Sequence, residues 1–346
     1  MPHQLYVFGS NGEGQLGIPA AEIVSTPTLV EQTPSLEILK SICGGDNHTL
    51  LLTEQQEVFG VGDNRKFQLV LGSGQPSQLE TWDTLDSGVS YVAATCESSA
   101  CIKVLKDSKQ SELYILGSGQ WGELGPDDDI PYYSITLPGR VVDFAAGVWH
   151  YVAVLEDGSV YGWGKARLGQ LGEQLTGKVM QPTKIENIPF VPRRVVCGKD
   201  LTYLVGDSAA GEHMVLGKDK FNIISSMPPN VAGWKDVGAT WHAIFVLFGD
   251  GKLMAWGRNT MWELIPPGLP PIDRIAIGSE HVLALTKARK LLSWGWGKHG
   301  NCGDLSNVQE KIKNDMVSGF WNEIDLPGQV KFIGAGYCTS FVVTQT

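Results

Sequence analysis

Two sequence phrases alternate along nearly the whole chain, and each occurs seven times. The first phrase is an apolar strand that ends in an aromatic or aliphatic residue, then a glycine, a short turn and a Gly-Gln-Leu-Gly-like ending. Its copies are Leu5–Gly17, Glu57–Val70, Leu113–Gly125, Val160–Gly172, Met214–Asn222, Leu253–Ile265 and Leu291–Gly303. The second phrase is a small residue, a glycine, two variable residues and His-Thr, followed by four or five apolar residues. Its copies, several of them worn, are Gly44–Leu52, Thr95–Val104, Ala146–Leu155, Cys197–Val205, Gly238–Leu247, Ile277–Leu285 and Ala335–Val343. Such repeats restrict the chain to a solenoid or a propeller, because each unit must bury its apolar face against a neighbour.

Each repeat unit predicts a hairpin of two long strands. Asp157-Gly158 and Asp250-Gly251 stand between apolar runs, and an Asp-Gly pair there indicates a two-residue type I′ turn, which needs positive φ at both central positions. The rest of each unit has room for two more strands. The glycine that follows the strand in each copy of the first phrase recurs every 38 to 57 residues. Four strands at this period are typical of a propeller blade.

The two ends of the chain decide between a solenoid and a closed ring. The first strand, Leu5–Phe8, lacks the strand that should precede it, and the last strand, Phe341–Thr344, lacks the one that should follow. Pairing the two closes a ring and removes exposed strand edges. We therefore predict an all-β, seven-bladed β-propeller closed by its N- and C-terminal strands, forming a single domain over residues 1–346. The histidine of the second phrase marks what we call the histidine position of each unit. We take the strand that follows this position as the inner strand of each blade.

Composition supports an all-β chain and excludes several functions. Glycine makes up 42 of 346 residues, about 12% against an average near 7%, and glycine at this density disfavours long helices. The formal charge is 27 − 37 = −10, so direct nucleic-acid binding, which needs a basic surface, is not expected. No run reaches 18 apolar residues, no signal-peptide stretch follows Met1, and none of the six cysteines belongs to a Cys-x-x-Cys pair. We therefore expect reduced cysteines, no membrane contact, and a cytoplasmic and nuclear location.

Two glycine patterns match the dinucleotide-binding fingerprint, at Gly295–Gly300 and Gly117–Gly122. The fingerprint works only at a turn from a strand into a helix, where the pyrophosphate meets the helix N-terminus. Here both matches fall at the same turn of the repeat, where glycine serves the turn itself. We therefore expect no nucleotide cofactor.

Four histidines invite a metal or acid–base interpretation. A metal ion needs ligands that converge to about 2 Å around it, whereas residues at one repeat position lie on different blades. The four that we assign to that position are His48, His150, His242 and His281. We interpret them as structural residues that bond between blades. Since no Gly-x-Ser-x-Gly elbow occurs either, we predict no catalytic residue, no metal site and no cofactor, and we expect that the protein is not an enzyme.

One face of the predicted propeller gathers aromatic residues. The loop before the histidine position and the turn after the next strand share a face, because the two strands are antiparallel. The residues that we place just before the histidine position are Asn47, Ser98, Trp149, Asp200, Trp241, Glu280 and Cys338, and the other turn adds Trp121, Trp262, Trp296, Lys298 and His299. Exposed aromatic residues beside acids are typical of a protein interface, although packing between blades is the alternative for each tryptophan, above all for Trp262. We predict a partner-binding surface formed by Trp149, Trp241, Trp296, His299, Lys298, Trp121, Asp200, Glu280 and Tyr337.

The two phrases together resemble the repeats of the regulator-of-chromosome-condensation family over essentially the whole chain. Phe8–Gly12, Gly62–Arg65, Gly278–His281 and Trp294–Gly303 are similar to the fungal alpha-tubulin suppressor branch of that family. The resemblance implies a non-catalytic adaptor with a small zinc-binding protein as its partner in a heterodimer. That zinc protein is shared by diphthamide synthesis on elongation factor 2 and by Elongator-dependent modification of the tRNA wobble uridine, which implies an indirect link to Elongator.

Two other functions known in the family stay open. Guanine-nucleotide exchange on a small GTPase is the activity of its founding member, which adds a basic N-terminal tail and a protruding β-wedge. This chain is acidic and enters its first blade by residue 5, which favours the adaptor. Ultraviolet sensing in plant members uses Gly-Trp-Arg-His-Thr motifs. Here no Gly-Trp-Arg triplet occurs, and we place Trp149 and Trp241 one position later.

Overall fold

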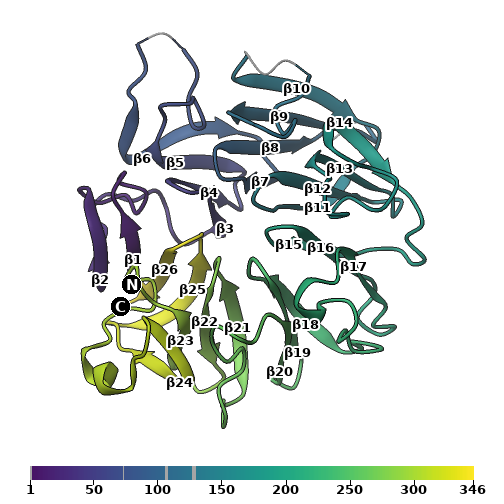
Figure 1. The fold of residues 1–346 in the computed structure, drawn as a ribbon. Coiled ribbons are helices and arrows are strands. Elements are labelled where there is room, and N and C mark those ends of the chain that lie inside the picture. Colours follow the sequence, from purple (N-terminus) through teal and green to yellow (C-terminus); the bar gives the residue numbers. More distant parts are fainter. Residues whose placement is uncertain (1, 73, 106–107, 127–129) are drawn as a thin grey trace.

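A computed structural model describes residues 2–72, 74–105, 108–126 and 130–346, and in these residues seven antiparallel sheets surround a central axis (Figure 1). Each sheet is one blade, and blade 7 contains both ends of the chain. The predicted all-β, seven-bladed propeller is therefore confirmed.

In blades 1 to 6 the strands follow one another in chain order from the axis outward. Blade 1 contains β3 (Leu39–Gly44), β4 (His48–Thr53), β5 (Glu57–Asp63) and β6 (Gln78–Ser87), and blade 2 contains β7 (Tyr91–Ala94), β8 (Ser98–Val104), β9 (Ser111–Gly117) and β10 (Tyr132–Leu137). Blade 3 contains β11 (Val141–Ala146), β12 (His150–Leu155), β13 (Val160–Lys165) and β14 (Lys178–Ile185). Blade 4 contains β15 (Arg194–Cys197), β16 (Leu201–Val205) and β17 (His213–Gly217), and blade 5 contains β18 (Trp234–Ala239), β19 (Ala243–Phe248) and β20 (Leu253–Gly257). Blade 6 contains β21 (Ile272–Ile277), β22 (His281–Thr286), β23 (Leu291–Trp296) and β24 (Met316–Ile324). Blade 7 contains, from the axis outward, β25 (Gln329–Ala335), β26 (Thr339–Gln345), β1 (His3–Asn11) and β2 (Ala21–Leu29). The 3-10 helices η1 (Lys220–Asn222) and η2 (Ser306–Lys311) lie in loops.

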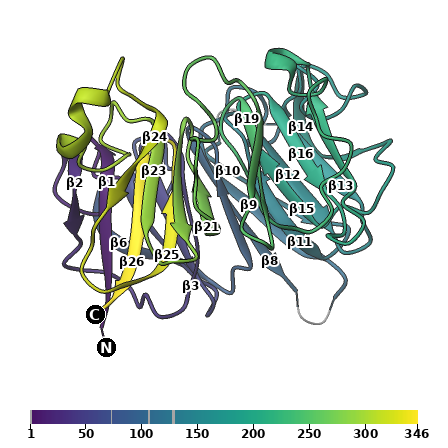
Figure 2. The same ribbon diagram turned by 90° about the horizontal axis from the view of Figure 1, so that it is seen from below.

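The two ends of the chain close the ring as predicted. β1 pairs with β26 over seven residue pairs, from His3↔Gln345 to Gly9↔Thr339. The amide of Thr346 also donates to the carbonyl of Pro2 at 3.3 Å. Figure 2 shows the two termini side by side at one face of the propeller, away from its axis. Blade 7 therefore depends on strands from both ends of the sequence.

The strand nearest the axis is not the one that the sequence predicted. The strands after the histidine position, such as β4 and β26, are second from the axis, and β3 and β25 are the innermost strands of their blades. β4 is buried at every position because neighbouring blades cover both of its faces. That burial produces the long apolar run. The innermost strands face the axis with small residues, such as Ala93, Ala94 and Ala146, so their hydrophobic signal is weak.

Two blades depart from the predicted four strands. Over the described residues, blades 4 and 5 have three strands each. After β20 the chain runs through Pro266, Pro267, Pro270 and Pro271, and proline has no N–H to donate to a strand ladder. After β17 the chain forms η1 and a loop instead of a fourth strand.

The Asp-Gly turns are three-residue turns rather than two-residue type I′ turns. The amide of Leu155 donates to Ser159, which leaves Glu156, Asp157 and Gly158 in the turn. Only Gly158 of the three has positive φ, at 86°. This is the pattern of a type I turn followed by a left-handed glycine, so the sequence predicted the place of the hairpin but not its type.

Apolar side chains fill the space between the strands and between neighbouring blades. In blade 3, Tyr151 and Trp163 are fully buried, with ring centroids 5.3 Å apart, and Phe144 stacks on both. No helix in the described residues is long and apolar enough to cross a membrane.

Candidate partner-binding face

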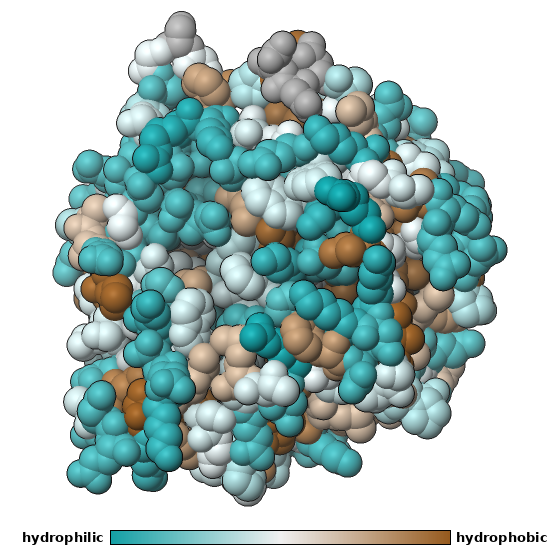
Figure 3. All heavy atoms as spheres, in the orientation of Figure 1, coloured by the Kyte–Doolittle hydropathy of each residue, from teal (hydrophilic) through white to brown (hydrophobic). Residues whose placement is uncertain are grey.

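Seven equivalent loops form one face of the propeller, which we call the loop face. Each loop precedes the second strand of its blade and is closed by a backbone hydrogen bond. For example, the amide of Gly45 donates to His48 at 3.0 Å, and that of Thr240 donates to Ala243 at 2.9 Å. The chain termini lie at the opposite face (Figure 2). Hydrophilic residues cover much of the propeller in the space-filling view along the axis (Figure 3).

A glycine in the third strand of each blade lets the chain approach these loops. The pairs are His48↔Gly62, Ser98↔Gly117, His150↔Gly164, Leu201↔Gly217, Ala243↔Gly257, His281↔Gly295 and Thr339↔Gly9. All seven glycines have φ between +97° and +148°, a range that other residues rarely adopt. A side chain at Gly295 would also strike the carbonyl oxygen of Glu280. The glycines therefore hold the loops and the following turns on one face.

Three of the predicted structural histidines are buried between blades. His48, His150 and His281 are at most 1% exposed, and each ring covers the glycine three residues earlier. Nε2 of His150 lies 3.0 Å from the Thr202 hydroxyl, and Nε2 of His281 lies 2.9 Å from the Ser340 hydroxyl. Burial lowers the pKa of His48 and His150 to about 4. Among the described residues, no three His, Cys, Asp or Glu side chains are grouped to hold a metal ion.

The register of blade 5 differs from the sequence prediction by one residue. Ala243, not His242, occupies the histidine position, because it is Ala243 that pairs with Gly257. Trp241 therefore stands two residues before that position, and His242 is the half-buried loop residue next to it. In blade 2, Ser98 likewise occupies the buried position itself, and Glu97 precedes it. The error arose because blade 5 has Thr240 where the phrase has its glycine.

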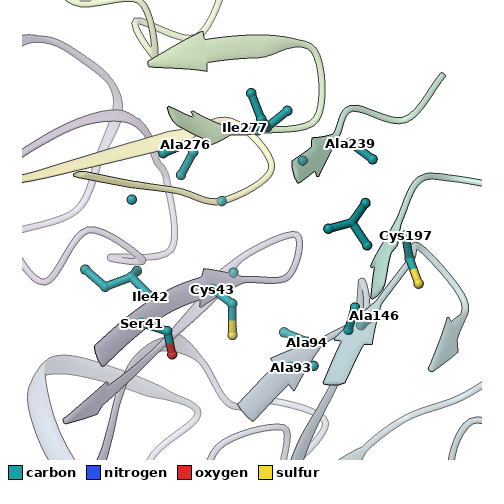
Figure 4. A pocket seen from close by; sticks show the side chains of 18 of the residues that line it. Ser41, Ile42, Cys43, Ala93, Ala94, Ala146, Cys197, Ala239, Ala276 and Ile277 are labelled. Carbon is teal, nitrogen blue, oxygen red and sulfur yellow. The ribbon is translucent and has the colours of Figure 1, made fainter. Parts of the chain in front are cut away.

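Of the predicted site residues, Trp241 and Tyr337 are the two that line the cavity on the axis. This cavity of about 410 Å³ runs between the innermost strands. Figure 4 shows small side chains such as Ala94, Ala239 and Cys197 around this cavity. The two rings meet edge to face with centroids 5.9 Å apart. The sequence-predicted Tyr337 is thus brought into contact with Trp241.

Trp121 and Asp200 are linked through Lys165. The Lys165 ammonium lies 5.4 Å from the centre of the Trp121 ring and 2.8 Å from the Asp200 carboxylate. Trp149 is half-buried and directly precedes His150 in blade 3, the blade that also contains Lys165. The amide of Lys165 donates to the Trp149 carbonyl at 2.8 Å. These contacts connect blades 2, 3 and 4 on the loop face.

Trp296, Lys298 and His299 form a separate group in blade 6. The rings of Trp296 and His299 are perpendicular, with centroids 5.0 Å apart, and Lys298 is exposed. Burial and Lys298 lower the pKa of His299, whereas Asp315 and Glu22 raise it. Because Glu22 belongs to β2 of blade 7, this group lies toward the outer part of the face and is not among the residues that line the axial cavity.

Glu280 does not form part of an exposed rim. Its side chain is 6% exposed and accepts a hydrogen bond from Nε1 of Trp262 at 3.2 Å. Burial raises the pKa of Glu280. Trp262 itself is 2% exposed and stacks on Phe245, as its packing interpretation expected. A repeat position specifies the place of Glu280 in the loop but not which way its side chain turns.

Several cations and an aromatic residue on this face were not predicted from the sequence. They are Lys199, Lys220, Phe221 and Arg258, which lie around Trp241 and His242. The only sequence feature that pointed to these residues was the divergent copy of the first phrase at Met214–Asn222. In that copy Lys218–Asn222 replaces the usual turn and its Gly-Gln-Leu-Gly-like ending.

The closed ring of seven blades defines a β-propeller, and aromatic residues gather on the loops of one of its faces. The RCC1-like domain family matches residues 4–342. The chain therefore belongs to the RCC1-like family, which indicates a regulatory or interaction role. The family resemblance noted from the repeats is confirmed at this level.

Several relatives match most of the chain. An RCC1 repeat-containing protein of Schizosaccharomyces pombe is 30% identical, covering 99% of both chains. The ultraviolet-B receptor UVR8 of Arabidopsis thaliana is 27% identical over 90% of this chain and 79% of its own. The secretion-regulating guanine nucleotide exchange factor of Mus musculus is 26% identical over 87% of this chain and 75% of its own.

Solved structures show the same fold. Human WBSCR16 has a TM-score of 0.80 at 19% identity, over 99% of this chain and all of its own. Prp20p of Saccharomyces cerevisiae has a TM-score of 0.80 at 20% identity, over 100% of this chain and 92% of its own.

Proposed function

We propose that the protein is a non-catalytic adaptor that holds a small protein partner on its loop face. The observation that carries this proposal is the aromatic arc of Trp121, Trp149, Trp241 and Tyr337, half-buried on loops that positive-φ glycines of the third strands hold on one face. Tryptophan and tyrosine are frequent interface anchors. Anchors on a rigid scaffold lose little conformational entropy on binding.

The partner that we propose is a small zinc-binding protein shared by diphthamide synthesis on elongation factor 2 and Elongator-dependent modification of the tRNA wobble uridine. The support is the resemblance to the alpha-tubulin suppressor branch in Phe8–Gly12, Gly62–Arg65, Gly278–His281 and Trp294–Gly303. The heterodimer would act in the cytoplasm and the nucleus, with an indirect link to Elongator and no direct contact with nucleic acid or membrane.

Affinity capture from cells tests this proposal. Tagged wild-type protein should capture a zinc-containing protein of under about 100 residues, a size that one propeller face of standard interface area can hold. A Trp241→Ala variant should lose that protein. A Val191→Ala variant is the control, because Val191 is 50% exposed beside the Gly158 turn of the opposite face. Capture of the zinc protein by the Trp241 variant at the wild-type level would contradict the proposed site.

Guanine-nucleotide exchange on a small GTPase is the second candidate. It is favoured by the match to the mouse relative that is named as an exchange factor. Capture of a GTPase, together with faster release of its bound GDP by the purified protein, would support exchange over the adaptor function. Capture of the zinc protein without any effect on GDP release would support the adaptor.

A further inference from the structure

A group of cations without carboxylate partners lies on the loop face in blades 4 and 5. Lys199 precedes β16, Lys220 lies in η1 and Arg258 follows β20. Within the described residues, none of these three side chains has an Asp or Glu oxygen within 4.0 Å. We call these three residues the cation cluster. The group stands out because the chain as a whole carries a formal charge of −10.

Aromatic rings support each member of the cation cluster. The Lys199 ammonium lies 5.1 Å from the centre of the Trp241 ring. Lys220 Nζ and Arg258 Cζ each lie 5.2 Å from the centre of the Phe221 ring. The Phe221 ring is in turn 5.2 Å from the ring of His242. Lys220 and Arg258 therefore share the Phe221 ring, and Lys199 lies over the neighbouring ring of Trp241, the residue before His242.

The nearby carboxylates are already engaged elsewhere. Asp200 pairs with Lys165 at 2.8 Å. Asp219 accepts from the amides of Ile224 and Ser225 at 2.8 and 3.0 Å. Buried Glu280 accepts from Trp262, and Arg258 and Lys199 act on it only through their charges, which lower its pKa against the larger, opposite effect of burial. The pKa of His242 is lowered to about 4 by burial and then by Lys220, Arg258 and Lys199, against the opposing effect of Asp200. The fields of all three cations therefore meet at His242.

The backbone presents Phe221 in an unfavourable conformation. Phe221 and Asn222 both have φ of 59°, a left-handed conformation that is rare for residues other than glycine. The Asp219 carboxylate caps the turn that follows, which holds this conformation in place. Such strain persists only where the surrounding structure fixes it, and it is often found at binding sites.

We propose that the cation cluster takes up two or more carboxylates of an acidic segment of the protein partner. An aliphatic or aromatic side chain of that segment would lie against Trp241 and Phe221. This inference rests on the proposed function and adds the chemistry by which the loop face recognises its partner.

The donors available at the cluster favour carboxylates over a phosphate group. Compact phosphate sites usually offer several free backbone N–H groups. Here the amide of Lys199 donates to Trp241, that of Arg258 to His242, and that of Lys220 to Lys218. Side chains on separate loops supply the charge instead. Nε of Arg258 is buried and has no hydrogen-bond partner within the described part of the chain, and a guanidinium stacked on a ring keeps its N–H edge free for a carboxylate.

Selection from a display library of random 12-residue peptides on the purified protein tests the proposal without the natural partner. Enriched peptides should be acidic and carry at least one aromatic or aliphatic residue. A selected peptide, labelled and measured by fluorescence polarisation, should bind at least about tenfold more weakly to the Lys220→Ala/Arg258→Ala variant, as expected for loss of charge-assisted hydrogen bonds. Replacing its Glu and Asp by Gln and Asn should have the same effect. Raising NaCl from about 50 to about 300 mM should also weaken binding several-fold.

Lys252→Ala is the matched control, because Lys252 is an exposed cation beside the turn that joins β19 and β20 on the opposite face. It should leave peptide affinity unchanged. Enrichment of neutral or basic peptides, no enrichment at all, or acidic peptides indifferent to the double variant would overturn the proposal. Inorganic phosphate that competes at micromolar concentration would assign the cluster to phosphate instead. A chain that binds no peptide but dimerises through the cluster would assign it to a second copy. Because no natural partner takes part, failure here is distinguishable from failure of partner capture.

Discussion

Trp241 of blade 5 and Tyr337 of blade 7 meet edge to face beside the axial cavity, with ring centroids 5.9 Å apart. Blade 6 lies between them, and its loop joins both through the backbone. The amide of Trp241 donates to Ser279 at 2.8 Å, and that of Ser279 donates to Tyr337 at 2.9 Å. The amide of Lys199 extends this chain by donating to Trp241 at 2.9 Å. The aromatic residues near the axis are thus fixed by bonds that run from blade to blade, as a preformed binding face requires.

Removing the N-terminal strand should open the ring. Deleting residues 1–10 removes most of β1, which is hydrogen-bonded to β2 on one side and to β26 on the other. The loss of ladder bonds and of buried Leu5, Val7 and Phe8 should destabilise the fold by several kcal/mol. Thermal unfolding measures the change. A circular permutant that joins residue 346 to residue 2 and opens at the turn after Asp250 keeps the pairing and should melt near the full chain. Equal melting of the deletion variant and the full chain would contradict the role of closure.

Replacing a positive-φ glycine should lower the stability of the fold without changing the affinity of the folded protein for its partner. Gly295→Val places a side chain against the Glu280 carbonyl at φ of 108°, which should cost about 1–3 kcal/mol of stability. Gly12→Val is the control on the same face, because nothing lies within 4 Å of its side-chain position and its φ is not positive. Partner affinity of the folded fraction should be unchanged in both variants. A Gly295 variant with native melting and no partner binding would place this glycine in the site.

The buried histidines should make stability fall in mild acid. The pKa of His150 is about 4 in the folded protein against about 6.5 when exposed. Between these pH values the unfolded chain gains a proton that the folded chain does not, so stability is lost as pH falls from 6.5 toward 4. At pH 5 the loss is about 2 kcal/mol for this residue. Denaturant unfolding at pH 7 and pH 5 should show a smaller loss for His150→Leu, which introduces the residue found at the same position in blade 4, Leu201. An unchanged pH dependence would mean that His150 is not held neutral.

Glu280 should prove dispensable for binding. Its carboxylate is buried against Trp262, and burial raises its pKa, which means that its charged form is disfavoured in the folded state. Glu280→Gln keeps an acceptor for Trp262 and removes the charge, so the melting temperature should stay equal or rise. Partner affinity should stay within about twofold of the wild type, the effect expected for a residue outside the interface. A tenfold loss of partner affinity in a folded Glu280→Gln variant would show that Glu280 does belong to the binding surface.

The fold was predictable from the sequence where burial and backbone geometry leave a repeating mark. The second strand of each blade, such as β4, is covered on both faces, and the glycine opposite the histidine position must adopt positive φ. These two demands recur in every blade, so the number of blades and the closure by Leu5–Phe8 and Phe341–Thr344 were predictable. The innermost strands leave a weaker pattern because small residues suffice beside the axial cavity.

The loop face was less predictable because contacts that differ from blade to blade determine how its side chains are oriented. Glu280 turns inward to Trp262, and Ala243 shifts Trp241 and His242 by one position. Lys220 and Phe221 lie in the segment that replaces a fourth strand in blade 4, where the repeat gives no guide. Periodicity therefore placed the face but not the cation cluster on it.

Partner binding by a protein that lacks two tryptophans tests the central claim most directly. Trp149→Ala combined with Trp241→Ala removes two half-buried rings from the loop face, and truncation of an interface anchor commonly costs about 2 kcal/mol or more, roughly thirtyfold in affinity. Calorimetric titration of the captured partner, alongside thermal unfolding of the same sample, separates binding from folding. We predict that the variant melts within a few degrees of the wild type and no longer binds the partner. A variant that remains folded and binds with full affinity would contradict the assignment of the loop face as the binding site.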